Sequence, residues 1–330
     1  MNVTSYKVAG FSPLEHLALE NTLLETWNQK TGLLLLYVNS PSIIIGRNQN
    51  PWREISSECT VPVFRRTSGG GTVYHDEGNL NWSFIIPRPL HSQEFELQEI
   101  ANAISSLGVS AVPGNRGGIF LKNKTGELQG KISGTARRFG SLNILHHGTL
   151  LISANLDRLR ASLASGLQTY DDASIASVPA HPVNLADYII GLDADTAAQS
   201  ISHFITGQAP EKIEINSLDD KTRELFESEK IRLSAPEWIL GATPDFSFSI
   251  STSMSSAEFR VSAGKIATIT MKQVDSNPYF HRIIESELYK FFSRQFSFVL
   301  LDEMKACMEL YQKNEHLGSA QRERRNYGDT

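Results

Sequence analysis

The amino-acid sequence predicts an α+β fold that is divided into two domains. Its 330 residues are too many for one typical core, since a prior of about 150 residues per domain suggests two. Helical spacing and short strand-like runs are interspersed along the chain, and near 236–246 a helix-rich stretch gives way to further strand-like runs. We therefore expect a large domain over 1–244 and a small α+β domain over 245–330, with the boundary near Pro244.

The large domain is expected to begin with a helix. Ser12, Pro13 and Glu15 provide an N-cap, a proline at the first helical position and a capping-box glutamate, and apolar residues then recur at helical spacing to about Asn28. The runs after this helix are rich in strand formers, and the first two are expected to be neighbours in one well-buried sheet. The strands expected here are 33–38, 43–45, 61–64 and 80–86, the last two on either side of a glycine-rich loop.

The rest of the chain alternates between strand and helix signals. In the large domain we expect a helix at 94–107, strands at 109–112 and 119–121, a turn at 123–126, a hairpin of 129–138 with 144–152, and helices at 156–163, 195–205 and 218–229. In the small domain we expect strands at 246–250, 258–261 and 266–271, helices from 279 to about 313, and a frayed tail at 321–330.

Composition excludes several classes of protein. A net charge of −5 argues against an electrostatic nucleic-acid binder, and the longest apolar run, 33–38, is too short to span a bilayer. Only two cysteines occur, Cys59 and Cys307, so we expect no disulfide framework, no CxxC metal site and a reducing compartment. The N-terminus has no signal-peptide core, and its first forty residues contain Lys7 and Lys30 but no arginine. We expect the cytoplasm, with the mitochondrial matrix as the alternative if the start is processed or misassigned.

The densest motif spans 65–79, where Arg65 and Arg66 precede the three consecutive glycines 69–71. Glycines before a strand weaken local packing, and one compensation is a close backbone approach to a ligand, with N–H groups aimed at an anion. Arginine suits bidentate contacts with phosphate or carboxylate. The alternative is a bulged turn whose arginines are solvated. The spacing fits neither a Walker A loop nor the GxGxxG fingerprint.

A second motif spans 130–136 and contains a lysine followed by two hydroxyl residues. In a strand, alternation places Lys131, Ser133 and Thr135 on one face. This row is a candidate phosphate-binding surface, and the alternative is the solvated face of a hairpin.

The histidines form two further candidates. His146 and His147 are adjacent in an expected strand, so at most one of them faces any one site. No third ligand lies at a convincing spacing, which argues against a zinc site. His75 followed by Asp76 could indicate acid–base catalysis, or Asp76 could hold a loop amide.

Taken together, these segments resemble the lipoate–protein ligase A family, within the biotin/lipoate ligase superfamily, over most of the chain. The resemblance implies a large catalytic domain with a mixed β-sheet flanked by helices, plus a small C-terminal domain. The segments that carry it, in family order, are 45–52, 65–79, 131–136, 146–151 and 238–246.

The resemblance also implies an activity. An ATP-dependent lipoate–protein ligase activates lipoate to lipoyl-AMP and then attaches the lipoyl group to a lysine of a partner protein. The implied substrates are ATP, with Mg²⁺, and lipoate. The implied acceptors are apo lipoyl domains of 2-oxoacid dehydrogenase E2 subunits and the glycine-cleavage H protein. We expect a monomer with no nucleic-acid or membrane partner.

Site residues follow from the resemblance by motif position. Lys131 is implied as the catalytic residue, in contact with both phosphate and the lipoyl carbonyl, and the metal ligands are unassigned. The implied ATP contacts are Arg66, Gly71, Thr72, Val73, Tyr74 and Lys131, and the implied lipoate contacts are Lys131, Gly70 and His75.

One position departs from the family pattern. Gly118 stands where the family usually has an acid, and Asn115 or Asp76 could substitute for it. Neither cysteine is a convincing nucleophile, which disfavours a thioester route. The alternatives are therefore a lipoyltransferase that uses preformed lipoyl-AMP, supported by Gly118, and a non-catalytic lipoyl-adenylate binder. The presence of both Arg66 and Lys131 argues against the binder.

Overall fold

The structure is a computed structural model that describes residues 2–28, 30–56, 59–114, 116–163, 167–214, 217–251 and 256–272. The helices expected from 279 to about 313, Cys307 and the tail 321–330 lie outside these ranges.

Contacts divide the chain into two compact units. The first unit comprises 1–49, 61–163 and 175–239, and the second comprises 50–60, 164–174 and 240–330. The second unit thus includes two short segments, 50–60 and 164–174, that interrupt the first unit along the sequence. The expected domain boundary at residue 244 stays a prediction.

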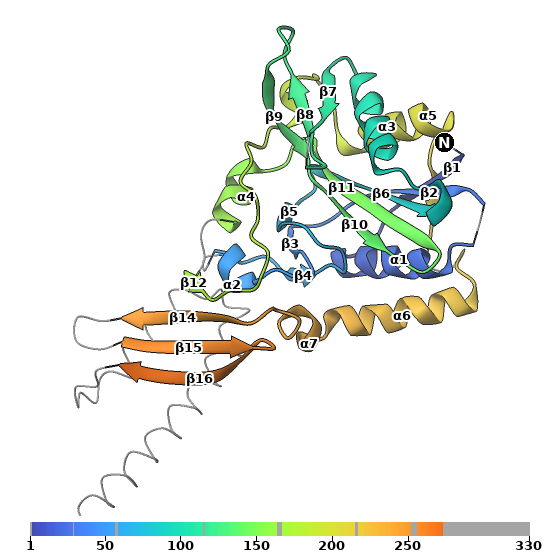
Figure 1. Cartoon of the computed structure of the whole chain (residues 1–330). Helices are drawn as coiled ribbons and strands as arrows, with labels where there is room; N and C mark the ends of the chain where they lie inside the picture. Colours follow the sequence, from blue (N-terminus) through green and yellow to red (C-terminus); the bar gives the residue numbers. More distant parts are fainter. Residues whose placement is uncertain are drawn as a thin grey trace, which may run out of the picture. The chain divides into compact units, whose positions relative to one another are not determined.

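The first unit holds most of the elements (Figure 1). In chain order they are β1 (Val3–Val8), α1 (Pro13–Thr26), β2 (Gly32–Val38), β3 (Ser42–Ile45), β4 (Val63–Arg65), β5 (Val73–His75), β6 (Asn79–Pro87), the 3₁₀ helix η1 (Arg88–Leu90), α3 (Gln93–Ser105), β7 (Ser110–Pro113), β8 (Ile119–Lys122), β9 (Leu128–Ser133), β10 (Thr135–Phe139), β11 (Asn143–Leu151), α4 (Leu156–Ser162), η2 (Leu185–Asp187), α5 (Ala194–Thr206), β13 (Glu211–Ile213), α6 (Asp220–Ser234) and α7 (Pro236–Ile239).

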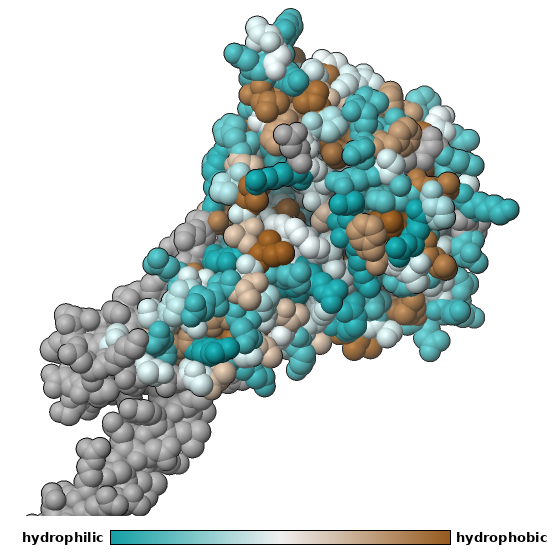
Figure 2. Space-filling view, viewed as in Figure 1, coloured by the Kyte–Doolittle hydropathy of each residue, from teal (hydrophilic) through white to brown (hydrophobic). Residues whose placement is uncertain are grey.

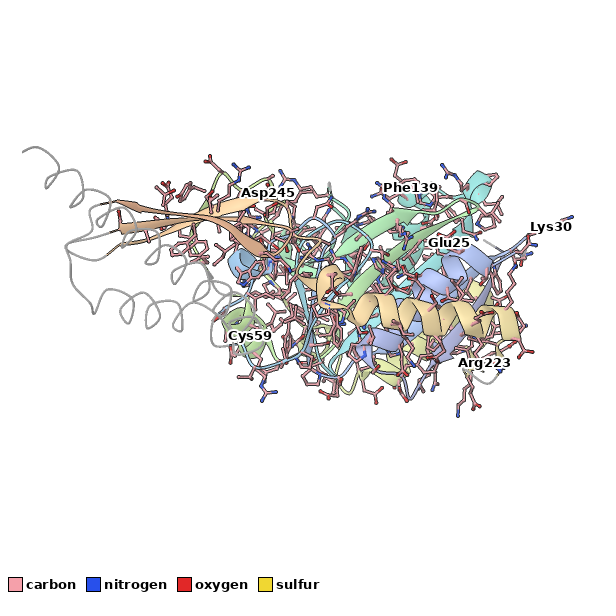
Figure 3. The ribbon with its side chains drawn as sticks, turned by 90° about the horizontal axis from the view of Figure 1, so that it is seen from below. Glu25, Lys30, Cys59, Phe139, Arg223 and Asp245 are labelled. Carbon is pink, nitrogen blue, oxygen red and sulfur yellow. The ribbon has the colours of Figure 1, made fainter. Side chains whose placement is uncertain are left out.

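A six-stranded mixed sheet forms the centre of the first unit, in the order β10-β11-β6-β2-β1-β13. The β1–β2 and β1–β13 pairs are parallel and the other pairs are antiparallel, which confirms an α+β fold with a mixed sheet flanked by helices. β2 is buried on both faces. Its Leu33 and Leu35 pack in one apolar cluster with α1 and α6, while Leu34 and Leu36 pack in another with α3 and α5. α6 runs alongside α1, on the same side of the central sheet as α1 (Figures 1 and 3).

The first helix forms as the sequence predicts. Ser12 Oγ accepts from the backbone N–H of Glu15, and the Glu15 carboxylate accepts from the backbone N–H of Ser12, so the capping box is confirmed. Strands β1 and β13 are not predicted from the sequence. β1 lies beside β2, and β13 forms the edge of the central sheet.

The expected pairing of 33–38 with 43–45 is wrong. β3 belongs to a separate three-stranded sheet, where it pairs in parallel with β4 and antiparallel with β5. Pro41 cannot donate a ladder hydrogen bond, and Ser42 Oγ donates to the Ser40 carbonyl at 2.9 Å, so the link turns away from the first sheet.

The expected single strand over 129–138 is also wrong, because it breaks at Gly134. β9 pairs with β8 in a third sheet, β7-β8-β9, while β10 pairs with β11 in the central sheet. Gly134 is held at the break by two hydrogen bonds to Thr149, one from its own N–H to Oγ1 at 3.2 Å and one to its carbonyl from the Thr149 N–H at 3.0 Å. The hairpin that remains is β10–β11.

The second unit contains α2 (Pro51–Glu54) and a four-stranded antiparallel sheet. Its strands are β12 (Thr169–Tyr170), β14 (Phe246–Ser251), β15 (Ser256–Ser262) and β16 (Lys265–Lys272), paired in that order. Phe248 and Phe259 stack with ring centroids 4.7 Å apart in its buried core. No helix among the described residues combines the length and apolar character that a membrane span needs.

Candidate active site

A cavity of about 550 Å³ lies where the three sheets of the first unit meet. Figure 2 shows the surface hollowed where β5, β9 and β11 approach one another in Figure 1, with hydrophilic and hydrophobic side chains on its border. The lining residues come from the glycine motif (Arg66, Gly70, Gly71, Thr72, Val73 and His75), from the turn before β8 and from β8 to β10 (Arg116, Gly118, Phe120, Lys131, Gly134, Thr135 and Ala136), from the central sheet, β3 and α1 (Leu17, Tyr37, Asn39, Ile44, Asn81, His147, Gly148 and Thr149), and from the segment 175–180.

The structure brings together all but one of the predicted site residues around this cavity. The exception is Tyr74, which is 2% exposed and does not line the cavity. Side chains alternate along β5, so Val73 and His75 face the cavity while Tyr74 faces away. In the second motif Lys131 and Thr135 line the cavity, but Ser133 does not. The register of β9 against β8 shifts between Lys131 and Ser133, which interrupts the alternation of side chains there. The predicted contacts of these residues with nucleotide and lipoate stay predictions.

Arg66 is buried and holds the glycine loop, which we define as residues 68–72. Its guanidinium donates to Ser68 Oγ at 3.0 Å and to the carbonyls of Ile44, Gly69 and Gly71 at 3.1, 2.5 and 2.8 Å. Of its five N–H groups, one on Nη1 has no partner among the described residues and remains for a ligand. Burial lowers the pKa of Arg66 to about 10, so the side chain stays charged at neutral pH.

Arg65 points to a different loop. It is fully buried and donates from Nη1 to the carbonyls of Gly46, Arg47 and Gln49 at 3.2, 2.9 and 2.8 Å, and from Nε to the Ile239 carbonyl at 2.8 Å. The two adjacent arginines therefore fix the loops on both sides of the β3–β4 pair.

Gly70 meets two requirements that only glycine fulfils. Its φ is +85°, in the left-handed region. A Cβ at Gly70 would also lie 3.1 Å from Arg66 Nη2, and a Cβ at the facing Gly46 would lie 2.1 Å from the Gly70 carbonyl oxygen. Gly69 has neither constraint, since its φ is not positive and a Cβ there would meet nothing within 4 Å.

Lys131 is a cation of the cavity wall, which also includes Arg66 and Arg116. Its backbone is fixed, since the N–H donates to the His181 carbonyl at 2.8 Å and the carbonyl accepts from the Val183 N–H at 3.1 Å. Its Nζ makes no hydrogen bond or ion pair with the described residues, and partial burial lowers its pKa. Gly118 lies against this side chain, because a Cβ there would be 2.9 Å from Lys131 Cε. Glycine at 118 thus leaves the lysine without a carboxylate beside it.

A buried polar chain runs behind the glycine loop. Glu20 accepts from Tyr37 Oη at 2.8 Å, from Ser83 Oγ, and from His147 Nδ1 at 3.0 Å. His147 Nε2 lies 2.7 Å from Ser68 Oγ, the same oxygen that accepts from Arg66. Burial raises the pKa of the Glu20 carboxyl. The His147 ring and the hydroxyl donors lower this pKa by more than burial raises it, so the carboxylate is ionised. This ionised group balances the charge of Arg66 through two intervening side chains.

The structure also shows where the adjacent histidines and Asp76 lie. His147 faces the cavity and His146 faces the opposite side of the sheet, beside Glu96, which confirms that only one of the pair looks into the site. Asp76 accepts from the N–H groups of Gly78 and Asn155 at 3.0 and 2.9 Å, so it holds loop amides and does not replace the missing acid.

Asn115 lies outside the described residues, and Cys59 is buried and is not a lining residue. Among the described residues, no group of three or more His, Cys, Asp or Glu side chains could hold a metal ion.

The segment 175–180 was not predicted as part of the site. Ser177 Oγ accepts from the Thr72 N–H at 3.0 Å and from Gln49 Nε2 at 3.0 Å, and the Gln49 side-chain oxygen accepts from Thr72 Oγ1 at 2.9 Å. At its other end the chain pairs with Lys131. The segment therefore joins the glycine loop to the lysine strand along the cavity. Its small apolar sequence carries no motif that could have identified it.

Comparisons with known proteins agree with this geometry. Residues 12–206 match the family model described as the lipoyl protein ligase A/B catalytic domain. The chain is similar to the structure of P. falciparum LipL1 in complex with lipoate, with 23% identity, a TM-score of 0.59, and coverage of 88% of this chain and 90% of that one.

Two further solved structures are similar. One is the bi-partite lipoate protein ligase of Thermoplasma acidophilum, described with its E2 lipoyl domain, with 20% identity, a TM-score of 0.57, and coverage of 73% of this chain and 98% of that one. The other is a lipoate-protein ligase A bound with ATP, with 21% identity, a TM-score of 0.54, and coverage of 72% and 97%. At these identities the likenesses show the shared fold. Because the family model covers more than half of its length, the chain belongs to the lipoyl protein ligase A/B catalytic domain family.

Proposed function

We propose that this chain is an ATP-dependent lipoate–protein ligase. In the first step a carboxylate oxygen of lipoate attacks the α-phosphorus of ATP, forming lipoyl-AMP and releasing pyrophosphate. In the second step a lysine amine of an apo lipoyl domain attacks the acyl carbonyl of this mixed anhydride, forming an amide and releasing AMP and a proton. The proposed acceptors are lipoyl domains of 2-oxoacid dehydrogenase E2 subunits and the glycine-cleavage H protein.

The observation that carries the proposal is the unpaired ammonium of Lys131 in a cavity that the glycine loop also lines. Both steps build negative charge on oxygens at one junction between acyl group and phosphate. A fixed cation in a partly buried wall offsets the repulsion between carboxylate and phosphate and then stabilises the developing oxyanion. The backbone N–H groups of the glycine loop and one N–H of Arg66 are suited to the phosphate oxygens.

Mg²⁺ enters this proposal as part of the ATP substrate. The described residues that line the cavity include no Asp or Glu, so these residues supply cations and N–H donors and leave the metal to the phosphate oxygens. The apolar part of the wall, with Leu17, Ile44 and Val73, suits the acyl chain of lipoate.

The ligands and partners with which similar structures are described support the proposed substrates and acceptor. The P. falciparum structure is described with lipoate, a lipoate-protein ligase A is described with ATP, and the T. acidophilum enzyme is described with its E2 lipoyl domain. A lipoyltransferase that takes preformed lipoyl-AMP is the second candidate, and Gly118 favours it, because the wall beside Lys131 lacks the acid of the family pattern.

The test separates the two steps. The full chain is incubated with lipoate, Mg-ATP and an apo lipoyl domain, and pyrophosphate release and acceptor lipoylation are followed independently. A parallel reaction supplies synthetic lipoyl-AMP in place of lipoate and ATP. A ligase gives both signals in the first reaction. Lipoylation only from supplied lipoyl-AMP would establish the transferase, and binding of lipoyl-AMP without turnover would establish a non-catalytic binder.

A further inference from the structure

Three large apolar side chains are exposed where the β10–β11 hairpin meets η1. Leu90, Phe139 and Leu142 are 58, 57 and 57% exposed, so each residue leaves more than half of its surface open to solvent. Two hydrogen bonds join the two segments, one from the Arg88 N–H to the Leu142 carbonyl at 3.0 Å and one from Arg88 Nη1 to the Gly140 carbonyl at 2.8 Å. A single exposed apolar residue is ordinary, but a group of them with a polar rim is typical of an interaction surface.

Arginines flank these apolar residues. The guanidinium of Arg137 lies over the Phe139 ring, 5.6 Å from its centroid, and the His91 ring meets the same ring edge-on, with centroids 6.1 Å apart. Neither Arg88 nor Arg137 forms an ion pair with a described residue. Aromatic and arginine side chains are enriched at protein–protein interfaces. We define the hairpin patch as Arg88, Leu90, Arg137, Phe139 and Leu142.

The cavity opens beside the start of β10. Arg116 lines the cavity and is exposed, so it lies at the mouth. The carbonyl of the next residue, Gly117, accepts from Thr135 Oγ1, which ties this side of the mouth to the first residue of β10. Figure 2 shows, on the face that carries the hollow, a hydrophobic area surrounded by hydrophilic residues.

Strand β10 connects this mouth to the hairpin patch. Thr135 lines the cavity, and alternation places Thr135, Arg137 and Phe139 on one face of the strand. At about 3.3 Å per residue, Phe139 lies about 13 Å along the strand from Thr135. A specific interface covers about 800 Å² on each partner, the area of a disc about 16 Å in radius. A protein seated on the mouth therefore also reaches the hairpin patch.

The charge of this surface indicates the chemistry of its partner. Like the two arginines of the patch, Arg116 forms no ion pair with a described residue. Three arginines without a carboxylate partner among the described residues thus extend from the mouth to the patch, in a chain whose net charge is −5. This local positive charge suits an acidic protein surface, and such complementarity accelerates association and fixes orientation.

We propose that the hairpin patch docks the acceptor lipoyl domain, through acidic side chains and an exposed apolar residue near its target lysine. This rests on the proposed function, whose second step brings a protein lysine into the cavity. The apolar residue of the acceptor covers Phe139, and its acidic side chains pair with Arg88 and Arg137 while the lysine enters the mouth. The patch contributes to affinity for the acceptor and takes no part in the chemistry.

The experiment separates docking from chemistry with two acceptors of different size. The full chain receives synthetic lipoyl-AMP with either an apo E2 lipoyl domain or N-acetyl-lysine amide, a small amine that cannot span the cavity and the patch. Phe139→Ser should raise the KM for the domain about tenfold, because truncation of a central interface aromatic costs at least that much affinity. The reaction with the small amine and the release of pyrophosphate from lipoate and Mg-ATP should not change.

The arginines are tested by charge reversal. Arg137→Glu should raise the KM for the domain more than Arg137→Gln does, and the difference should shrink as salt is added, because exposed charges are screened. Ile231→Ser is the matched control, since Ile231 is a largely exposed apolar residue of α6 that does not line the cavity. It should keep the wild-type KM for both acceptors. Melting temperatures establish that each variant is folded.

An unchanged KM for the domain in both Phe139→Ser and Arg137→Glu would overturn the inference and leave the proposed function standing. An equal loss of both acceptor reactions would also overturn it, because the effect would then lie in the chemistry. A wild-type dimer in sedimentation that Phe139→Ser dissociates, with the KM unchanged, would assign the patch to a second copy of the chain. Wild-type protein that modifies neither acceptor and releases no pyrophosphate would reject the proposed function itself.

Discussion

Arg65 and Arg66 donate to backbone carbonyls on two sides of strand β4, and this is how a segment with three glycines keeps one conformation. Glycine loses more backbone entropy on folding than other residues, so such a loop needs fixed contacts. Arg66 binds the carbonyls of Gly69 and Gly71, while Arg65 binds the loop that begins at Gly46. From the sequence, both arginines are equal candidates for an anion. The structure leaves one N–H of Arg66 to that role, and the difference depends on partners far away in sequence.

At the same scale, Lys131 is expected to act in the transition state more than in binding. Lys131→Met keeps the apolar stem and removes the charge, so the protein should fold with near-normal affinity for lipoate. Its rate should fall about a hundred- to a thousandfold in adenylation and in transfer from supplied lipoyl-AMP. Lys131→Arg should restore little, because its charge is spread over a planar fork. Quenched assays of each step measure these rates, and wild-type rates in both steps would show that the ammonium of Lys131 takes no part in the chemistry.

The cysteines are expected to be dispensable, because an adenylate mechanism forms no covalent bond to the enzyme. Cys59 is buried and does not line the cavity. Cys59→Ser and Cys307→Ser should each keep lipoylation rates within about threefold of wild type, a difference below 1 kcal/mol in the barrier. Mass spectrometry of the protein quenched during turnover provides the second measurement. An acyl-thioester on either cysteine would replace the adenylate mechanism with acyl transfer.

Among elements, the sequence predicts secondary structure better than pairing. The helices at 13–28, 94–107 and 195–205 were recoverable, because capping residues and apolar spacing are local signals. The sequence wrongly predicts β3 beside β2 and a single strand over 129–138, because strand partners depend on hydrogen bonds to distant segments. The hydrogen bonds between Gly134 and Thr149 divert the chain from one sheet to another, and no local pattern marks them.

The glycine loop provides the prediction at this scale, with a control in the same element. Gly70→Val places a β-branched side chain at φ +85° and 3.1 Å from Arg66 Nη2. It should weaken ATP binding by at least about tenfold, the equivalent of about 1.4 kcal/mol, while the melting temperature falls by only a few degrees. Gly69→Ala has open space at its Cβ and should bind ATP nearly as wild type does. Normal ATP affinity in Gly70→Val would place the loop outside the nucleotide site.

Across the whole molecule, the cavity could be foreseen only in part. Motif residues from the glycine loop, β5 and β9 were predicted from the sequence, and the structure brings them together around one cavity. The segment 175–180 and Asn39 were not foreseen, since their roles arise from hydrogen bonds to Thr72, Gln49 and His75 over long sequence separations. The cavity is therefore a property of the assembled sheets, and residues without a motif complete it.

We expect the free energy of unfolding of the whole chain to depend on pH, because two buried histidines, His16 and His75, have lowered pKa values. The pKa of His16 falls from 6.5 to about 4 and that of His75 from 6.5 to about 3 in the folded chain, so between these values the unfolded chain binds more protons. The free energy of unfolding therefore rises with pH in this window, and stability is lost as pH falls below about 6.5. Each histidine contributes a slope of up to about 1.4 kcal/mol per pH unit.

Urea unfolding between pH 7 and pH 5 measures this slope. His75→Phe should reduce the number of protons taken up on unfolding by about one, and the slope should fall accordingly. An equal slope in wild type and His75→Phe would mean that His75 takes up its proton in the folded protein as readily as in the unfolded chain.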